Sequence, residues 1–358
     1  MDDVNRREFL KVAGAVATIT TAMPAVPATA GDLCFTSAID LARLIRAKKI
    51  SAREVMAAHL AQIARVNPKV NAIVAKLPDE RCLALADEAD RRAASGGTLP
   101  PLHGLPIAFK DLQPAVGFPF SRGSPIYKDE MPAADSVLVE RLRRAGAIPI
   151  GKTNTPEFGM GSHTYNKVYG TTYNPYDVTK SAGGSSGGAG AALATGMLPI
   201  ADGSDLGGSL RNPANFNNIV ALRPTVGLVP TAPTPFPLLG FAVNGPMARS
   251  VADVAFLLSV MAGADPRDPG CAESTPAVFA KPLERRFRGT RVAWCPDLGG
   301  LPLDPRVRTV LEAQRKTLDT LGCSVEEACP DLSGADWIFL TLRQWRTAAT
   351  LGPLLSTH

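Results

Sequence analysis

Two glycine-rich segments place serines where a hydroxyl could act as a nucleophile. Residues 183–188 read GGSSGG, and residues 203–211 read GSDLGGSLR. Glycine permits tight turns that present a neighbouring side chain, and a serine attacks a carbonyl when a nearby base accepts its proton. The pattern therefore suggests acyl-transfer or hydrolytic chemistry, and the identity of the base becomes the question.

Histidine often serves as the base for such a serine, but the order of residues argues against it here. Residues 183–187 fit the G-x-S-x-G turn of α/β-hydrolases, in which an acid and then a histidine follow the serine. The one histidine after Ser185 is His358, the final residue. The S-x-x-K pattern of penicillin-binding enzymes does not occur in the chain.

Lys110 offers a different base. It ends the apolar run at residues 105–109 and precedes Asp111. Burial favours the neutral amine, because desolvation penalises the ammonium form, and active sites of open α/β sheets lie at strand ends. A strand-end lysine that extends its amine to solvent fits the same pattern equally well.

A formal match to the phosphate-binding P-loop occurs at residues 146–153, GAIPIGKT. Pro149 lacks the N–H group that a phosphate cradle needs, and residues 147–150 are apolar enough to form a strand. We therefore expect no nucleotide site here. Pro156 after Thr155 predicts a helix that starts at this point, with Thr155 as its N-terminal cap.

Hydrophobic periodicity predicts that helices and strands alternate. Ser51 and Glu54 form a capping-box pattern within residues 36–95, which are predicted to be helical. Residues 183–208 are rich in Gly, Ala and Ser but carry no charge before Asp202, so we expect a buried, tightly turned segment instead of a flexible linker. Further strands are predicted at 105–109, 147–150, 291–294 and 324–326, and further helices at 136–144, 189–195 and 306–321. The alternation predicts an α/β fold.

Composition excludes several classes of protein. The 358 residues are 45% hydrophobic and 20% charged, which is typical of a globular protein. The net charge of +5 is spread over isolated pairs, and without a basic stripe we expect no nucleic-acid partner. The cysteines contain no C-x-x-C pair, which argues against zinc and leaves buried thiols or one disulfide as alternatives. They are Cys34, Cys82, Cys271, Cys295, Cys323 and Cys329.

The N-terminus has the order of an export signal. Residues 5–11 (NRREFLK) are basic, no charge follows until Asp32, and Ala-Thr-Ala at 28–30 suits a signal peptidase. The arginine pair resembles a twin-arginine signal. We therefore expect a signal peptide at 1–30, one domain at 31–358, and a periplasmic or secreted protein without a stable membrane anchor. An ordinary N-terminal arm is the alternative.

Five segments together resemble the amidase signature family. In chain order they are 103–111 (HGLPIAFKD), 151–159 (GKTNTPEFG), 183–188 (GGSSGG), 203–211 (GSDLGGSLR) and 245–253 (GPMARSVAD). One glycine–serine motif would be weak evidence, whereas five in the family's order are specific. The resemblance implies a large mixed β-sheet covered by helices on both faces.

The resemblance also implies a Ser–cisSer–Lys triad. By motif position Ser209 is the nucleophile, Ser185 is the bridging serine after a cis peptide bond at Gly184, and Lys110 is the base. Neutral Lys110 would accept a proton through Ser185 while Ser209 attacks an amide carbonyl, and water would then hydrolyse the acyl-enzyme. No metal or other cofactor is implied.

Further roles follow from the same motif positions. Ser186 is expected to hydrogen-bond to the relay, and Asp205 and Arg211 are expected to brace the turn as an ion pair. Ser204 is a departure, because the family often has threonine there. The backbone N–H groups expected to face the oxyanion belong to four consecutive residues: Leu206, Gly207, Gly208 and Ser209.

The resemblance implies an amidase that converts a small carboxamide to a carboxylate and ammonia or an amine. A glutamine-dependent transamidase subunit of the same family is the alternative function. Family members continue beyond the position that matches His358, so a truncated C-terminal part and an inactive homologue form a third interpretation. A homodimer is left open.

Overall fold

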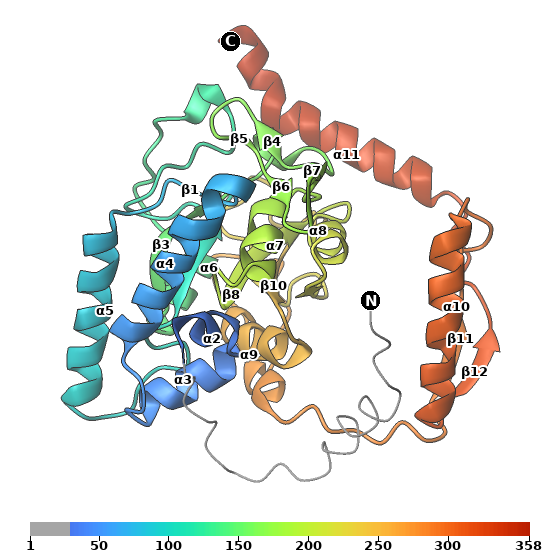
Figure 1. Cartoon of the computed structure of the whole chain (residues 1–358). Coiled ribbons are helices and arrows are strands. Elements are labelled where there is room, and N and C mark those ends of the chain that lie inside the picture. Colours follow the sequence, from blue (N-terminus) through green and yellow to red (C-terminus); the bar gives the residue numbers. More distant parts are fainter. Residues whose placement is uncertain (1–28) are drawn as a thin grey trace. The chain divides into compact units, whose positions relative to one another are not determined.

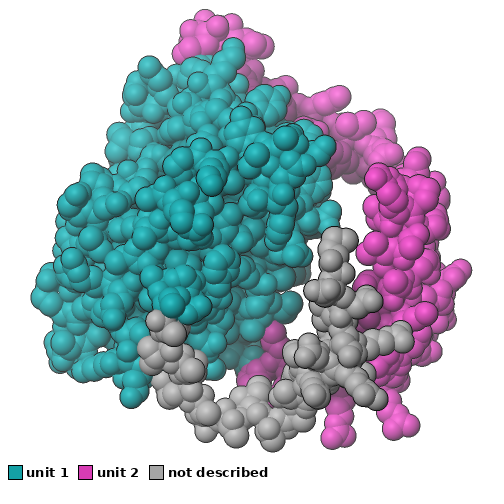
Figure 2. Space-filling model, in the orientation of Figure 1, with its two compact units in different colours: residues 1–281 teal, residues 282–358 magenta. Residues whose placement is uncertain are grey.

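The computed structural model (Figure 1) describes residues 29–358. The expected signal peptide, apart from its last two residues, therefore lies outside the described residues. The chain divides into two compact units, coloured separately in Figure 2, with the division between Lys281 and Pro282. No sequence signal predicts a boundary at this position.

Unit 1 begins with helices. The Glu54 N–H donates to Ser51 Oγ at 3.0 Å, and the Ser51 N–H donates to the Glu54 carboxylate at 2.7 Å, so the predicted capping box is confirmed. The short strand β1 (Ile73–Val74) interrupts the region predicted to be wholly helical. The helices are α2 (Ala30–Phe35), α3 (Ala38–Arg46), α4 (Ala52–Val70) and α5 (Asp79–Ala94), of which α4 and α5 run side by side (Figure 1).

The first sheet has the strand order β1-β3-β2. β2 (Pro106–Lys110) and β3 (Ile148–Thr153) are parallel, and α6 (Val137–Arg144) lies between them in the chain. β1 pairs with β3 in the antiparallel direction. The strand predicted at 147–150 is confirmed and continues through Thr153, so the letters GKT lie in a buried strand and not in a loop.

The helix predicted to start behind Thr155 is wrong. The structure has a short 3-10 helix at Glu157–Gly159 instead, and its cap is Pro156. Phe158 takes a left-handed φ of 54°, which a regular right-handed helix does not accommodate. Thr155 is buried, and its N–H donates to the side chain of Asn154 at 3.0 Å.

The second sheet has the strand order β8-β10-β9. β8 (Ile200–Asp205) pairs with β10 (Val243–Ala248) in antiparallel register over the full length of both strands. β9 is Val220–Ala221, and α9 (Val251–Met261) follows β10. Unit 1 also contains α8 (Arg211–Phe216), the hairpins β4 (Tyr165–Asn166) with β5 (Gly170–Thr171) and β6 (Tyr173–Asn174) with β7 (Asp177–Ser181), and 3-10 turns at Pro125–Tyr127 and Pro276–Ala280.

The segment before β8 is buried, as its lack of charge predicts. Within residues 183–201, all side chains are buried except those of Ala194 and Thr195, which are partly exposed. The predicted helix is present as α7 (Gly187–Ala194). Its small residues bring the helix backbone into close contact with β1 and β3, because no larger side chain separates them.

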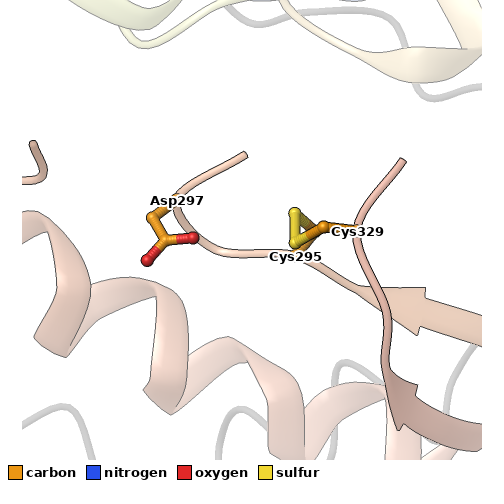
Figure 3. A group of neighbouring side chains, drawn as sticks. All are labelled: Cys295, Asp297 and Cys329. Carbon is orange, nitrogen blue, oxygen red and sulfur yellow. A yellow bond between two sulfur atoms is a disulfide. The ribbon is translucent and has the colours of Figure 1, made fainter. Parts of the chain in front are cut away.

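Unit 2 contains two parallel strands joined by a helix. β11 (Arg291–Trp294), α10 (Pro305–Thr320) and β12 (Ser324–Glu327) match the elements predicted at 291–294, 306–321 and 324–326. A disulfide joins Cys295 to Cys329 just beyond the ends of the two strands (Figure 3). The alternative of one disulfide is therefore the correct one for this pair, while Cys34 and Cys82 are free and buried.

The last helix of unit 2 is α11 (Ala335–Leu351), followed by a 3-10 turn at Gly352–Ser356. It exposes large apolar side chains, including Trp337 at 71% and Trp345 at 50%. Neither α11 nor any other helix within residues 29–358 is long and apolar enough to cross a membrane.

Replacement of Gly188 by alanine is expected to destabilise unit 1. An added Cβ would lie 2.3 Å from the Asn154 nitrogen and 2.7 Å from the Ala72 oxygen, and both are backbone atoms. Alanine is the better helix former by about 1 kcal/mol, but overpacking of this kind costs about 3 kcal/mol. Urea unfolding should show a lower free energy of unfolding for Gly188→Ala.

Gly31→Ala is the matched control. Its Cβ would make only an ordinary contact of 3.6 Å with the Thr29 hydroxyl. The control should unfold at a urea concentration close to that of the unaltered protein. Equal stability of Gly188→Ala and the control would show that α7 can move away from β3 at little cost.

Candidate active site

Lys110 is the last residue of β2, and its side chain is fully buried. Its Nζ lies 2.8 Å from Ser185 Oγ and 2.8 Å from Ser186 Oγ. A third hydroxyl, Ser204 Oγ, lies at 3.0 Å. Of the two interpretations of this lysine, burial is therefore the correct one, and the amine is surrounded by serine hydroxyls.

Burial changes the proton affinity of this amine. Desolvation lowers the pKa of Lys110 from 10.5 to about 7, because the ammonium form loses its hydration. The negative charges of Asp202 and Asp205 act in the opposite direction. A substantial fraction of Lys110 is therefore neutral near pH 7, as a general base requires.

The loop at residues 183–188 is held at both sides by one hydroxyl. Thr164 Oγ1 donates to the Gly183 carbonyl at 2.8 Å and accepts from the Gly187 N–H at 3.1 Å. The Gly184–Ser185 peptide bond between them is cis, as the resemblance implied. Thr164 thereby fixes the loop that presents Ser185 to Lys110.

Ser209 lies between β8 and α8 and is partly exposed. Its carbonyl accepts a hydrogen bond from the Ser186 N–H at 3.2 Å, which ties the two serine segments together. Within residues 29–358 no hydrogen bond joins Ser209 Oγ to Ser185 Oγ. The link from Lys110 to Ser185 is therefore direct, whereas Ser209 is brought to the cluster through its backbone.

Asp205 organises the turn that carries Ser209. Its carboxylate accepts from the Gly208 N–H at 2.8 Å and from the Leu210 N–H at 3.1 Å. The expected ion pair with Arg211 is present at 3.0 Å, and Arg223 lies 3.5 Å away. Burial raises the pKa of Asp205, but the hydrogen bonds from Arg211 and the turn outweigh it, so the net pKa is below the ordinary value.

The four expected oxyanion donors are not equivalent. The Gly208 N–H already donates to the Asp205 carboxylate at 2.8 Å. Gly208 therefore supports the turn and is not the oxyanion donor that the motif predicted. The N–H groups of Leu206, Gly207 and Ser209 have no hydrogen-bond partner in the described part of the chain. These three are available to a developing negative charge.

Three residues at the site were not assigned a role from the sequence. Thr164 hydrogen-bonds to both sides of the loop at residues 183–188. Ser204 contacts the Lys110 amine, and Asp202 Oδ1 accepts a hydrogen bond from the Lys110 backbone N–H at 3.1 Å. Ser204 and Asp202 are two positions apart on β8, so they share one face of the strand. The two-residue spacing of Asp202 and Ser204, just before the Gly-Gly-Ser turn, could have indicated that both side chains face the site. Nothing in the sequence indicated a role for Thr164.

A group of potential metal ligands lies in unit 2. Within residues 29–358, Cys295, Asp297 and Cys329 form the only such group (Figure 3). The two sulfur atoms are joined as a disulfide, so they are not available as thiolates. The serine–lysine cluster of unit 1, formed by Lys110, Ser185, Ser186 and Ser204, contains none of these residues.

Known proteins are similar to this chain over most of its length. The family model described as Amidase matches residues 54–349, which includes segments of both units. An acylamidase of Rhodococcus erythropolis is 38% identical over 302 residues, which are 84% of this chain and 63% of the relative. An indoleacetamide hydrolase of Bradyrhizobium diazoefficiens is 41% identical over 305 residues, which are 83% of this chain and 57% of the relative.

A glutamyl-tRNA(Gln) amidotransferase subunit of Acidothermus cellulolyticus is 40% identical over 305 residues, which are 84% of this chain and 59% of the relative. This chain thus spans less than two thirds of each relative's length. Among solved structures, a bacterial aryl acylamidase has a TM-score of 0.75 at 30% identity, with 83% of this chain and 62% of that chain covered. A peptide amidase from Stenotrophomonas maltophilia has a TM-score of 0.70 at 32% identity, with 84% and 63% covered. The α/β fold, the family model and these relatives together show that the chain belongs to the amidase signature family.

Proposed function

We propose that the protein hydrolyses a small carboxamide through an acyl-enzyme formed on Ser209. The observation that carries the proposal is the position of the Lys110 amine, which is fully buried and 2.8 Å from Ser185 Oγ. A neutral lysine in contact with a serine hydroxyl can accept a proton from it. The chemistry needs no cofactor.

In the proposed first step, Lys110 accepts the Ser185 proton while Ser185 accepts the proton of Ser209. The Ser209 oxygen then forms a bond to the amide carbonyl carbon. Lys110 then returns a proton to Ser185, and Ser185 donates its own proton to the departing nitrogen as the C–N bond breaks. Water then attacks the resulting ester and passes its proton through Ser185 to Lys110, and a proton returns by way of Ser185 to the Ser209 oxygen as the carboxylate leaves. Ser186 and Ser204 orient the amine through their contacts with Nζ.

The negative charge that develops on the carbonyl oxygen requires hydrogen-bond donors. We propose that the N–H groups of Leu206, Gly207 and Ser209 supply them. Gly208 contributes indirectly, because its bond to Asp205 fixes the turn. Loss of one such donor typically costs about 3 kcal/mol in the transition state.

The substrate class is proposed from the relatives. Two of them are named for acylamides and indoleacetamide, so we propose a linear amide with an aryl or aliphatic acyl group. The second candidate is a glutamine transamidase component, because the relative from the glutamyl-tRNA(Gln) amidotransferases is 40% identical. An amide panel separates the two candidates, because a transamidase component should act on glutamine far better than on aryl amides.

We also propose export by the twin-arginine route with cleavage after Ala30. In the structure the Asp32 N–H donates to Thr29 Oγ1 at 3.1 Å, and this bond caps α2. Cleavage after Ala30 would remove that cap, at a typical cost of about 1 kcal/mol of helix stability. N-terminal sequencing of the exported protein should begin at Gly31, and replacement of Arg6 and Arg7 by lysine should prevent export.

Labelling with a fluorophosphonate tests the nucleophile and the base. The unaltered protein should become labelled at Ser209, and Ser209→Ala should not react. Lys110→Ala should slow labelling by roughly 100-fold or more, because general-base assistance is lost. Peptide mapping by mass spectrometry identifies the modified serine.

Ser259→Ala is the control for these variants. Ser259 lies on α9 and donates to the Phe256 carbonyl at 2.6 Å, and no hydrogen bond in the described part of the chain joins it to Lys110, Ser185 or Ser209. The Ser259→Ala variant should be labelled at Ser209 at the rate of the unaltered protein. Labelling of folded Ser209→Ala at another serine would overturn the assignment.

The pH dependence of amide hydrolysis should follow the neutral fraction of Lys110. Its pKa is lowered to about 7 by desolvation, so kcat/KM should rise tenfold per unit below pH 7 and level off above it. Measurement between pH 5 and 9 with one aryl amide would show this rise, which is the acid limb of the profile. A profile that is flat between pH 6 and 8 contradicts a lysine base.

A further inference from the structure

Asp202 is a buried carboxylate directly behind the base. It lies in β8, is fully buried, and accepts the backbone N–H of Lys110 on Oδ1 at 3.1 Å. β2 and β8 belong to different three-stranded sheets, although they are neighbours in the fold. The Asp202 side chain therefore supplies a hydrogen bond between two sheets where a backbone ladder would otherwise be needed.

The second oxygen of this carboxylate is unusual. Oδ2 of Asp202 is buried and has no hydrogen-bond partner in the described part of the chain. A polar atom buried without a partner costs free energy, and a charged one costs more. A structural bond to one N–H group would need only a neutral acceptor such as asparagine. The negative charge itself therefore requires an explanation.

Charged side chains around Asp202 explain how a negative charge can be kept at this buried position. Lys110 and Lys152 are the two cations that act on it, and Lys152 lies 3.6 Å from the carboxylate of Asp111. All four of these side chains are fully buried. The neighbouring strand β10 reads VNGPMA and α7 reads GGAGAALA, so neither adds a titratable group. Lys152, together with the protonated form of Lys110, thus offsets two buried carboxylates beneath the serine cluster.

We propose that Asp202 is a positioning residue for the Lys110 base, holding its backbone through Oδ1 and keeping its amine basic through the carboxylate charge. The proposal deepens the function proposed above and rests on Lys110 acting as the base. Lys152 contributes by keeping Asp202 ionised. Asp202 itself does not contact the substrate or the reacting atoms.

The electrostatics support this arrangement. Asp202 exerts the largest charge effect on Lys110, and it raises the Lys110 pKa against the stronger effect of desolvation. Burial raises the pKa of Asp202 itself to about 6, while the hydrogen bond from the Lys110 N–H and the charge of Lys152 oppose that rise. Above pH 6 the carboxylate is therefore mostly ionised, in the range where Lys110 loses its proton. Asp205 is the other anion that acts on Lys110.

Asp202→Asn separates the charge from the hydrogen bond. The amide oxygen can still accept the Lys110 N–H, but the negative charge is gone. The acid limb of kcat/KM should therefore move to lower pH by roughly one unit, which is a tenfold change in the proton affinity of the base. The plateau should fall as well, because a less basic amine accepts the serine proton less well. A folded Asp202→Asn variant with an unmoved limb would overturn the proposal, and so would a limb shifted to higher pH.

Asp253→Asn is the matched control. Asp253 is also buried, and it accepts a backbone N–H, that of Ile39, at 3.0 Å, but it belongs to α9. It should change stability without moving the limb. Asp202→Ser provides a second neutral side chain in case the asparagine variant does not fold. A purely structural role for Asp202 would lower stability or the plateau in these variants and leave the limb where it is.

A direct titration distinguishes this inference from the proposed function. The Cε carbon of Lys110 can be followed by NMR in protein labelled with ¹³C-lysine, with its signal assigned through Lys110→Met. The titration midpoint of Lys110 should fall by roughly one unit in Asp202→Asn, whether or not the protein hydrolyses amides. A shifted midpoint in a protein without amidase activity would uphold the charge coupling and reject the function. An unshifted midpoint would reject the coupling even in an active enzyme.

Discussion

Burial of the Lys110 amine among three serine hydroxyls is the constraint on which the rest of unit 1 depends. An ammonium group at this position would lose its hydration without a carboxylate in direct contact, so the neutral form becomes accessible near pH 7. The same burial requires two loops to approach β2 closely from different parts of the chain. One loop brings Ser185 and Ser186, and the end of β8 brings Ser204.

Backbone contacts hold these loops in place. Thr164 fixes the loop before α7, and Asp205 fixes the turn after β8 through two N–H groups and two arginines. The Ser186 N–H then joins one loop to the other through the Ser209 carbonyl. Small residues in α7 permit this approach, because a side chain at Gly188 would meet the backbone of Asn154. The positions of the hydroxyls are thus determined by main-chain geometry more than by side-chain packing.

Much of this arrangement was predictable from residue order and spacing. The capping box at Ser51, the strand that ends at Lys110 and the elements of unit 2 follow from local patterns, and the structure confirms them. The helix expected behind Thr155 was wrong, because a left-handed residue at Phe158 overrides the signal from proline. The sequence could not reveal that the Gly208 N–H binds Asp205, or that Thr164 reaches across to the serine loop. Both contacts depend on how distant or sharply turned segments meet in three dimensions.

The four buried ionisable side chains beneath the site also bear on how the sequence can change. Loss of Lys152 alone would leave Asp111 and Asp202 as buried anions with too little compensation, and such changes are strongly destabilising. Replacement of Lys152 and Asp111 together by apolar residues of similar volume removes one charge of each sign, so we expect it to cost less stability than loss of Lys152 alone. Substitutions at these positions are therefore expected to occur in pairs. Lys152 in β3 and Asp111 directly after β2 would then change together in related sequences, although both side chains are fully buried.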